Sequence, residues 1–266
     1  MSLEELYRYA RDYMEPKNEG ARKRFEQMIG LFMTLELPGN GKVLDLCAGT
    51  GIAGAALTKA TDAKLLTLVD AREDDLKRSE EWLEMAGIEP EIRLVRGDIR
   101  GINKLVGEHD LAVLFGNTMI HFDPFDAVRI FAGVASTLSD GGVFMIEDTD
   151  RVYRILYLIG YKEFLVESKG EDHTLASVHE GYNVFRGTFK RSYYLLPGFR
   201  KVGEFDFYHW NLSSQLAIGR IFFREVQLIR AEKEGFSRLS DVLIFRGPRR
   251  EIARHVLEDF SVPYKE

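Results

Sequence analysis

Cysteine is almost absent from this chain. Its 266 residues include a single Cys, Cys47, so an internal disulfide framework is excluded and a reducing compartment is expected. The sequence also has no apolar run of signal-peptide or membrane-span length, and charged residues begin at Glu4. We therefore expect a cytoplasmic protein with no membrane partner.

An excess of positive charge is missing as well. The formal net charge is −6, so no overall basic field would attract a nucleic acid. His173 and His179 are too loosely spaced for a zinc signature, and we expect no metal site. Hydrophobic residues make up 45% of the chain and include 18 Phe, which suffices for one α/β domain with an insertion or for two small domains.

The most informative run extends from Lys42 to Gly54. An apolar segment carrying Asp45 breaks into a glycine turn and continues as a helix of small residues. Glycines allow the backbone to close on a ligand, and a helix N-terminus offers unpaired N–H groups. Gly49 to Gly54 also fits the dinucleotide fingerprint, which would indicate a nicotinamide dehydrogenase. Asp45 argues against that alternative, because its carboxylate would repel a pyrophosphate but suits a cationic ligand.

This run resembles the first motif of class I S-adenosylmethionine-dependent methyltransferases. Further segments resemble later motifs of the family in the expected order: Leu65–Asp70, Ile92–Ile99, Asp110–Thr118 and Leu138–Glu147. The resemblance implies an α/β fold with a Rossmann-like sheet, helices on both of its faces, and S-adenosyl-L-methionine as cofactor.

The resemblance also implies roles for individual residues. Asp70 would hold the two ribose hydroxyls, Asp98 would accept from the adenine amino group, and the Gly116-Asn117 loop would lie beside the methyl group. The complete expected cofactor-binding set is Asp45, Cys47, Ala48, Gly49, Gly51, Asp70, Ala71, Asp98, Ile99, Gly116 and Asn117.

The loop Gly116-Asn117-Thr118 indicates the type of acceptor. It resembles the Gly-Asn-Ser of glycine N-methyltransferase-like small-molecule enzymes. The Asn-Pro-Pro-aromatic motif, usual in enzymes that methylate nucleic-acid bases or glutamine amides, is absent there.

No side chain stands out as a catalytic group. His121 is a candidate general base, since an unperturbed His titrates at roughly pH 6.5, although packing against the next helix also explains it. Tyr13 belongs to an expected N-terminal helix that would act as a lid near the sulfonium, although Tyr7, Tyr9 and Tyr13 also fit a core-facing stripe. Because the methyl group of the cofactor is already activated, positioning is the main requirement.

Pattern and composition divide the chain into four segments. Residues 1–36 are expected to form a helical lid interrupted near Pro16 to Gly20, and residues 37–150 the cofactor-binding core, with a helix at about 73–85. Residues 151–222 would form a substrate cap, with a helix over 152–164 and antiparallel strands over 174–210. Residues 223–266 would return to the core with a helix at 224–234, a strand at 241–245 and a helix at 252–260.

These observations predict a transferase that methylates a nitrogen or oxygen atom of a small molecule. An RNA or protein acceptor is the alternative, because Arg186, Lys190 and Arg191 interleave with aromatics that could stack on bases. A half-buried sheet with one solvated face accounts for the same alternation and is favoured. A scaffold that binds cofactor without catalysis also stays open, as does the oligomeric state, a homodimer included.

Overall fold

The computed structural model describes residues 15–170 and 173–260. The helical and strand elements of this part of the chain are, in order, α2 Glu19–Thr34, β1 Lys42–Leu46, α3 Ile52–Thr61, β2 Leu65–Asp70, α4 Glu73–Leu76, α5 Glu80–Ala86, β3 Glu91–Arg96, η1 Ile99–Gly101, α6 Ile102–Leu105, β4 His109–Leu114, η2 Thr118–His121, α7 Pro124–Thr137, β5 Leu138–Asp148, α8 Arg151–Tyr153, η3 Arg154–Ile159, β6 Phe164–Lys169, β7 Thr174–Asn183, β8 Thr188–Leu196, β9 Arg200–Tyr208, α9 Leu212–Phe222, β10 Phe223–Ile229, η4 Ala231–Glu234, β11 Asp241–Pro248 and α10 Arg250–Asp259. The expected first helix, with Tyr7, Tyr9 and Tyr13, lies outside the described residues.

The larger sheet has the strand order β10-β11-β5-β4-β1-β2-β3 within the described residues. Strands β1 to β5 run parallel, whereas β11 is antiparallel to both β5 and β10. The central strands β1, β2 and β4 are buried along almost their whole length, because helices cover both faces of a parallel sheet. Their carboxyl ends therefore meet at one edge, where Asp45 and Asp70 are brought together.

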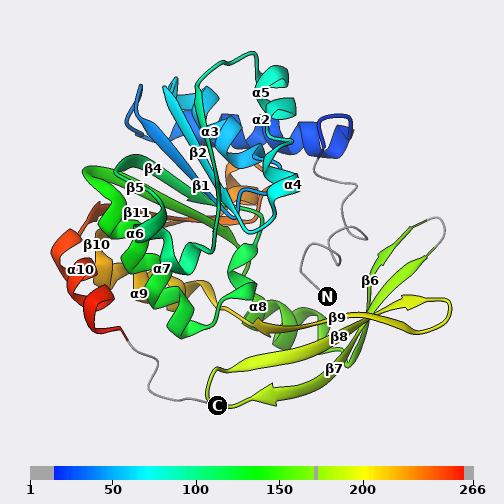
Figure 1. The fold of residues 1–266 in the computed structure, drawn as a ribbon. Helices are drawn as coiled ribbons and strands as arrows, with labels where there is room; N and C mark the ends of the chain where they lie inside the picture. The colour runs from blue at the N-terminus through cyan, green and yellow to red at the C-terminus, as the bar shows by residue number, and fades with distance from the viewer. Residues whose placement is uncertain (1–14, 171–172, 261–266) are drawn as a thin grey trace.

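Helices form a layer on each face of this sheet (Figure 1). One hydrophobic cluster joins α2, α3 and α5 to the sheet, and Phe25 stacks on Trp82 there with ring centroids 5.0 Å apart. A second cluster joins α7, α9 and α10 to the opposite face. The Rossmann-like fold expected from the motifs is confirmed.

A second, antiparallel sheet of order β6-β7-β8-β9 projects beyond the carboxyl edge of the first (Figure 1). The antiparallel pattern expected over 174–210 is confirmed, and Pro197-Gly198 forms the turn between β8 and β9. The helix expected over 152–164 ends early, at Ile159. Gly160 then takes a φ of 69°, and the chain re-enters as β6.

Two other helix predictions are corrected by the structure. The helix expected at 224–234 is wrong, because β10 occupies most of this segment and pairs with β11, with Val226 opposite Phe245. The helix expected at 73–85 is interrupted between α4 and α5. The strand at 241–245 and the helix at 252–260 are confirmed; the strand extends to Pro248, and the helix runs from Arg250 to Asp259.

Helix α9 was not expected, because its residues fell within the segment assigned to the cap. It packs on the core instead: an added Cβ at Gly219 would lie 2.1 Å from Phe245 Cε1 and 3.1 Å from Phe131 Cε1. The close approach of α9 to the sheet therefore depends on this glycine.

Candidate active site

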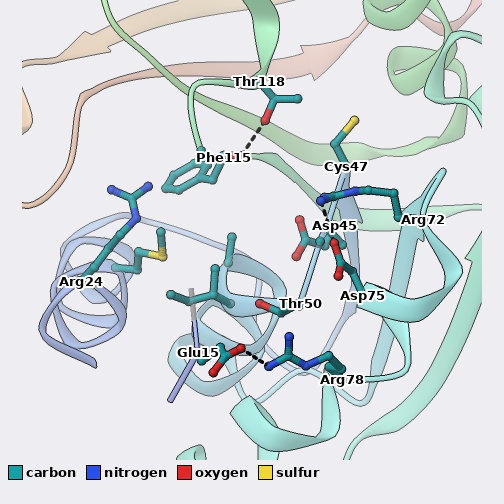
Figure 2. Close-up of a pocket in the computed structure, with 16 residues that line it drawn as sticks. Glu15, Arg24, Asp45, Cys47, Thr50, Arg72, Asp75, Arg78, Phe115 and Thr118 are labelled. Carbon is teal, nitrogen blue, oxygen red and sulfur yellow. Dashed lines mark hydrogen bonds and ion pairs between the residues drawn. The ribbon is translucent and has the colours of Figure 1, made fainter. Parts of the chain in front are cut away.

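A cavity of about 140 Å³ opens at the carboxyl ends of β1 and β4 (Figure 2). Its lining, among the described residues, is Glu15, Arg24, Met28, Asp45, Cys47, Ala48, Gly49, Thr50, Ile52, Ala53, Arg72, Asp75, Arg78, Phe115, Gly116 and Thr118. The motif at 42–54 supplies much of this surface, as its glycine turn predicted. Figure 2 also shows Glu15 paired with Arg78 at one side of the cavity, with the atoms Arg78 Nη2 and Glu15 Oε1 2.8 Å apart.

The glycine turn is shaped by close approach as well as by backbone angles. Gly51 is the N-cap of α3 at a φ of 80°, and an added Cβ would lie 2.9 Å from Ser79 Cβ. An added Cβ at Gly54 would lie 2.8 Å from Asp45 Oδ2. The N-cap Gly51 has no side chain to cap α3, and among the described residues Asp45 accepts from Gly54 N only, so the N–H groups of Ile52 and Ala53 stay available to a ligand.

Asp45 is buried beside this turn and lines the cavity. Its Oδ2 accepts a hydrogen bond from Gly54 N at 2.7 Å. Burial raises the pKa of Asp45 to about 7, a rise that the Gly54 hydrogen bond opposes and the charge of Asp70 reinforces. A cation in the cavity would favour the ionised form, so the site suits a ligand that carries an ammonium group.

Asp70 is less accessible than expected for a strand end. The residue is 4% exposed, its Oδ2 accepts from Gly49 N at 2.8 Å, and its Oδ1 accepts from Arg72 N at 2.8 Å and Arg72 Nε at 3.1 Å. Arg72 also pairs with Asp75 at 2.6 Å and lines the cavity in front of Asp70. The arginine two positions later therefore covers the carboxylate to which the sequence analysis assigned the ribose hydroxyls.

Asp98 repeats this arrangement at the end of β3. Its carboxylate accepts from Arg100 N at 2.9 Å and from Arg100 Nε, and this arginine holds the pKa of Asp98 below its usual range although partial burial opposes the shift. Asp98 does not line the cavity. Of the three strand-end acids, Asp45 alone contributes to the cavity surface.

The other residues of the expected set divide between the cavity and its surroundings. Cys47, Ala48, Gly49 and Gly116 line the cavity, while Gly51, Ala71, Ile99 and Asn117 do not. Burial raises the pKa of the Cys47 thiol, so this thiol is held neutral and is not an activated nucleophile.

A second cavity, of about 710 Å³, lies between the loop after β4 and the small sheet. Its lining, among the described residues, is Gly116, Asn117, Ile120, His121, Thr149, Arg151, Arg154, Ile155, Ile159, Gly160, Tyr161, Lys162, Leu165, Glu167, Ser168, Leu175, Arg191, Tyr193, Phe207, His209 and Ser240. Gly116 lines both cavities. The two spaces therefore meet at the loop that follows β4.

His121 lines this second cavity, with its ring centroid 5.5 Å from that of Phe207. Burial lowers the pKa of His121 to about 4, and the positive charges of Arg151 and Arg72 add to the shift. Its imidazole is thus neutral near pH 7 and can accept a proton or hydrogen bond. Tyr13, the other catalytic candidate, lies outside the described residues.

Glu147 anchors the loop that lines both cavities, and it was not predicted from the sequence. It is fully buried at the end of β5; its Oε2 accepts from Gly116 N at 2.9 Å and pairs with Arg24, and its Oε1 accepts from Ser240 N at 2.9 Å. One carboxylate thus fixes the shared loop relative to α2 and β11. An acid after the apolar run Val143 to Ile146 was the signal available in the sequence.

Arg151 holds the same loop from the other side. It pairs with buried Asp148, and its Nη2 donates to Asn117 O at 2.9 Å. Gln215, on α9, donates to Asp148 Oδ2 at 2.6 Å. The loop between the cavities is therefore anchored through both of its flanks.

The basic and aromatic residues in β8 and in the turn before it do not form an open basic surface. Lys190 pairs with Glu204, Arg186 pairs with Asp123, and Arg191 is buried. This arrangement favours the half-buried sheet over a platform for RNA bases.

In residues 15–170 and 173–260, no group of three or more His, Cys, Asp or Glu side chains is arranged to hold a metal ion. No helix of this part of the chain is long and apolar enough to cross a membrane.

Comparison with known proteins agrees with this geometry. Residues 43–142 match the family model of a methyltransferase domain. Among solved structures, an S-adenosylmethionine-dependent methyltransferase of Clostridium acetobutylicum ATCC 824 aligns with a TM-score of 0.60 and 16% identity, over 91% of this chain and 98% of that one. A protein of Pyrococcus horikoshii OT3 aligns with a TM-score of 0.61 and 18% identity, over 93% of this chain and 100% of that one.

The sugar N-methyltransferase KedS8 of Streptoalloteichus sp ATCC 53650 aligns with a TM-score of 0.56 and 14% identity, over 93% of this chain and 94% of that one. These three likenesses concern the fold. No curated protein matches the chain in sequence. The family match, the ordered motifs and the sheet with its glycine turn agree: residues 43–142 form a methyltransferase domain, within a Rossmann-like fold that the chain shares with an S-adenosylmethionine-dependent methyltransferase.

Proposed function

We propose that the chain transfers a methyl group from S-adenosylmethionine to a nitrogen or oxygen atom of a small molecule held in the second cavity. The observation that carries this proposal is the shared wall at Gly116, which lines both cavities. An acceptor in the larger cavity would meet the cofactor at this loop. Small-molecule sites are typically concave and largely apolar with a few polar groups, and the aromatic lining of the larger cavity supports that type of ligand.

The cofactor, when bound, supplies a methyl group on a positively charged sulfonium. The carboxylate of Asp45 would bind the methionyl ammonium. Asp70 would bind the ribose hydroxyls after the Arg72 side chain moves away, since the backbone donors of Gly49 and Arg72 leave lone pairs on its oxygens. Asp98 would accept from the adenine amino group in the same manner, once Arg100 releases it.

The remaining residues of the proposed site supply surface and shape. Cys47, Ala48 and Gly49 would contact the cofactor through the glycine turn, with Gly51 at the start of α3. Ala71 and Ile99, each directly following an acid, would flank the nucleoside. Gly116 and Asn117 would lie beside the methyl group.

The second sheet would act as the substrate cap. It supplies Arg191, Tyr193 and Phe207 to the lining of the second cavity. We place the end of this cap near Asn211, since α9 packs on the core.

Cofactor choice is tested by calorimetry with S-adenosylhomocysteine and with NAD. We expect micromolar binding of S-adenosylhomocysteine and no binding of NAD. The reverse pattern would refute the assignment of the first cavity.

Acceptor class is tested with isotope-labelled methyl groups offered to small-molecule extracts, to RNA and to protein. We expect label in the small-molecule fraction. Label in RNA, together with RNA retention that weakens steeply as salt rises, would favour the alternative acceptor.

His121 is the candidate proton acceptor of this proposal. Because its pKa is lowered to about 4, we expect kcat to stay level from pH 8 down to about pH 5 if its neutral form is required. His121→Gln should lower kcat by about 10²-fold or more if His121 acts as a general base, with KM little changed. An unchanged kcat in His121→Gln would mean that His121 is not a general base and only packs against its neighbours.

A further inference from the structure

The second cavity has an unusual balance of charge for a chain with a net charge of −6. Four cationic side chains line it, namely Arg151, Arg154, Lys162 and Arg191, against one carboxylate, Glu167, among the described residues. Arg151 is neutralised by its pair with Asp148. The other three cations therefore decide the field in the cavity.

Arg191 is the central member of this group. It is 7% exposed, and its donors reach Ser177 Oγ at 2.8 Å, Tyr161 Oη at 3.1 Å and Lys162 O at 2.9 Å, with further bonds to backbone carbonyls. All of these partners are neutral, and none of the ion pairs of the described residues involves Arg191. A buried charge is costly unless it is paired, so the absence of a counterion here calls for an explanation.

Glu167 does not fill that role directly. Its Oε1 accepts from Ser177 Oγ, the hydroxyl that in turn accepts from Arg191 Nε. One hydroxyl therefore separates the carboxylate from the guanidinium. At the rim, Arg154 and Lys162 are exposed and take part in no ion pair of the described residues, so their charges stay available to a ligand.

His209 provides an independent sign of a missing ligand group. It lines the same cavity, and both of its ring nitrogens are buried without a hydrogen-bond partner in the described part of the chain. Buried polar atoms are normally satisfied, so an unpaired pair of ring nitrogens indicates a partner that binds there. Burial lowers the pKa of His209 to about 4, with the positive charges of Arg151 and Arg191 adding to the shift, which agrees with an uncompensated positive field.

We infer that the methyl acceptor carries an anionic group, a carboxylate or a phosphate, that binds in the field of Arg191 with Arg154 and Lys162 at the entrance, while His209 hydrogen-bonds a polar group of the same molecule. This inference rests on the proposed function, because it names the class of acceptor for that site. Charge complementarity of this kind also raises the rate at which a ligand enters a cavity.

The test compares anionic probes with neutral probes of similar shape on the complex with S-adenosylhomocysteine. Benzoate is compared with benzamide, and phenyl phosphate with phenol, with binding measured by ligand-detected NMR titration. We expect at least one anion to bind about tenfold or more tightly than its neutral partner. A larger anion preference in the benzoate pair indicates that the acceptor carries a carboxylate. A larger preference in the phenyl phosphate pair indicates a phosphate.

Three variants assign that preference to the cavity. Arg154→Gln combined with Lys162→Gln removes exposed charges without disturbing a packed contact, and should reduce the anion preference about three- to tenfold. Arg191→Met should abolish it if the variant folds. Lys64→Gln removes one exposed charge beyond the opposite end of β2 and should leave the preference unchanged.

Two results would overturn the inference: equal binding of neutral and anionic probes, or an anion preference that survives in the double variant as in the parent. Binding of S-adenosylhomocysteine is measured on every sample and reports on the first cavity alone. If the parent protein does not bind S-adenosylhomocysteine, the proposed function is contradicted. If the parent protein binds S-adenosylhomocysteine but shows no anion preference, only this inference is contradicted.

Discussion

At the scale of single residues, the site is dominated by carboxylates that the fold buries. Asp45 is 1% exposed, and burial raises its pKa to about 7. A group whose pKa is raised on folding contributes stability that is present at low pH and is lost as the pH rises through that pKa. Asp45 therefore destabilises the folded chain most above pH 7, where the ionised form could hold an ammonium group.

Replacing Asp45 by Asn tests this conflict between stability and binding. The amide oxygen can still accept from Gly54 N, while the buried charge is removed. We expect the free energy of unfolding of Asp45→Asn, relative to the parent, to increase between pH 4 and pH 8 by roughly 1–4 kcal/mol. Urea unfolding at several pH values measures it, and a difference that is independent of pH would contradict the raised pKa.

Asp70 has both a structural and a proposed binding role. Asp70→Ala should weaken binding of S-adenosylhomocysteine by roughly 1.5–3 kcal/mol, the usual value of hydrogen bonds to a charged group. The variant should also be less stable, because Gly49 N and Arg72 N lose their acceptor. Calorimetry and urea unfolding separate the two effects, with Asp140→Ala as a control at a residue whose side chain is 95% exposed. Unchanged cofactor affinity would refute the ribose role.

At the scale of elements, the packing of α9 offers a sharp test of the fold. Gly219→Ala would place a methyl group 2.1 Å from Phe245 Cε1, which requires α9 to shift away from the sheet. We expect a loss of about 1–3 kcal/mol in the free energy of unfolding, as is usual for overpacking. Gly141→Ala is the control, because an added Cβ there meets nothing within 4 Å. Equal stability of the two variants would mean that α9 packs less closely than described.

The elements that the sequence predicted are those with local signals. Strand β1, the glycine turn and α3 follow from an apolar run, three glycines and small residues, so their identity does not depend on distant parts of the chain. Strand β10 was predicted as a helix, because its residues become a strand only through pairing with β11. Helix α9 was not predicted for the same reason. The need for a glycine at position 219 arises from contacts with Phe245 and Phe131, which are distant in the sequence.

Site residues divide in the same way. Asp45, predicted as a cofactor-binding residue, lies on the cavity surface, because it stands near the end of β1, directly before the glycine turn. The covering of Asp70 by Arg72 depends on side-chain conformations that a motif does not record. Glu147 was missed because its partners, Gly116, Arg24 and Ser240, come from three distant segments.

At the scale of the whole molecule, the two sheets differ in the size of their cores. The small sheet has a buried cluster of five residues, Leu175, Tyr193, Leu195, Val202 and Phe207, in the described part of the chain. The large sheet has an extensive cluster on each face. Regions with few buried apolar contacts open at lower free energy than the rest of a protein.

Hydrogen exchange measures this difference. We expect amides of β6 to β9 to exchange through openings that cost less free energy than those of β1, β4 and β5. Added S-adenosylhomocysteine should protect the loop around Gly116 more than the outer strand β6. Uniform protection of both sheets would instead indicate that cap and core unfold as one unit.

Because Gly116 lines both cavities, the two spaces adjoin, and this has a consequence for ligand design. One molecule that joins a cofactor fragment to an acceptor fragment through a short linker could occupy both spaces at once. Once the first fragment is bound, the second is held at a high effective concentration, and such linkage can raise affinity about 10²–10⁴-fold without any new contact. Only a linker that matches the passage beside Gly116 would achieve this, so a series of linker lengths would measure the width and direction of the path that the methyl group takes.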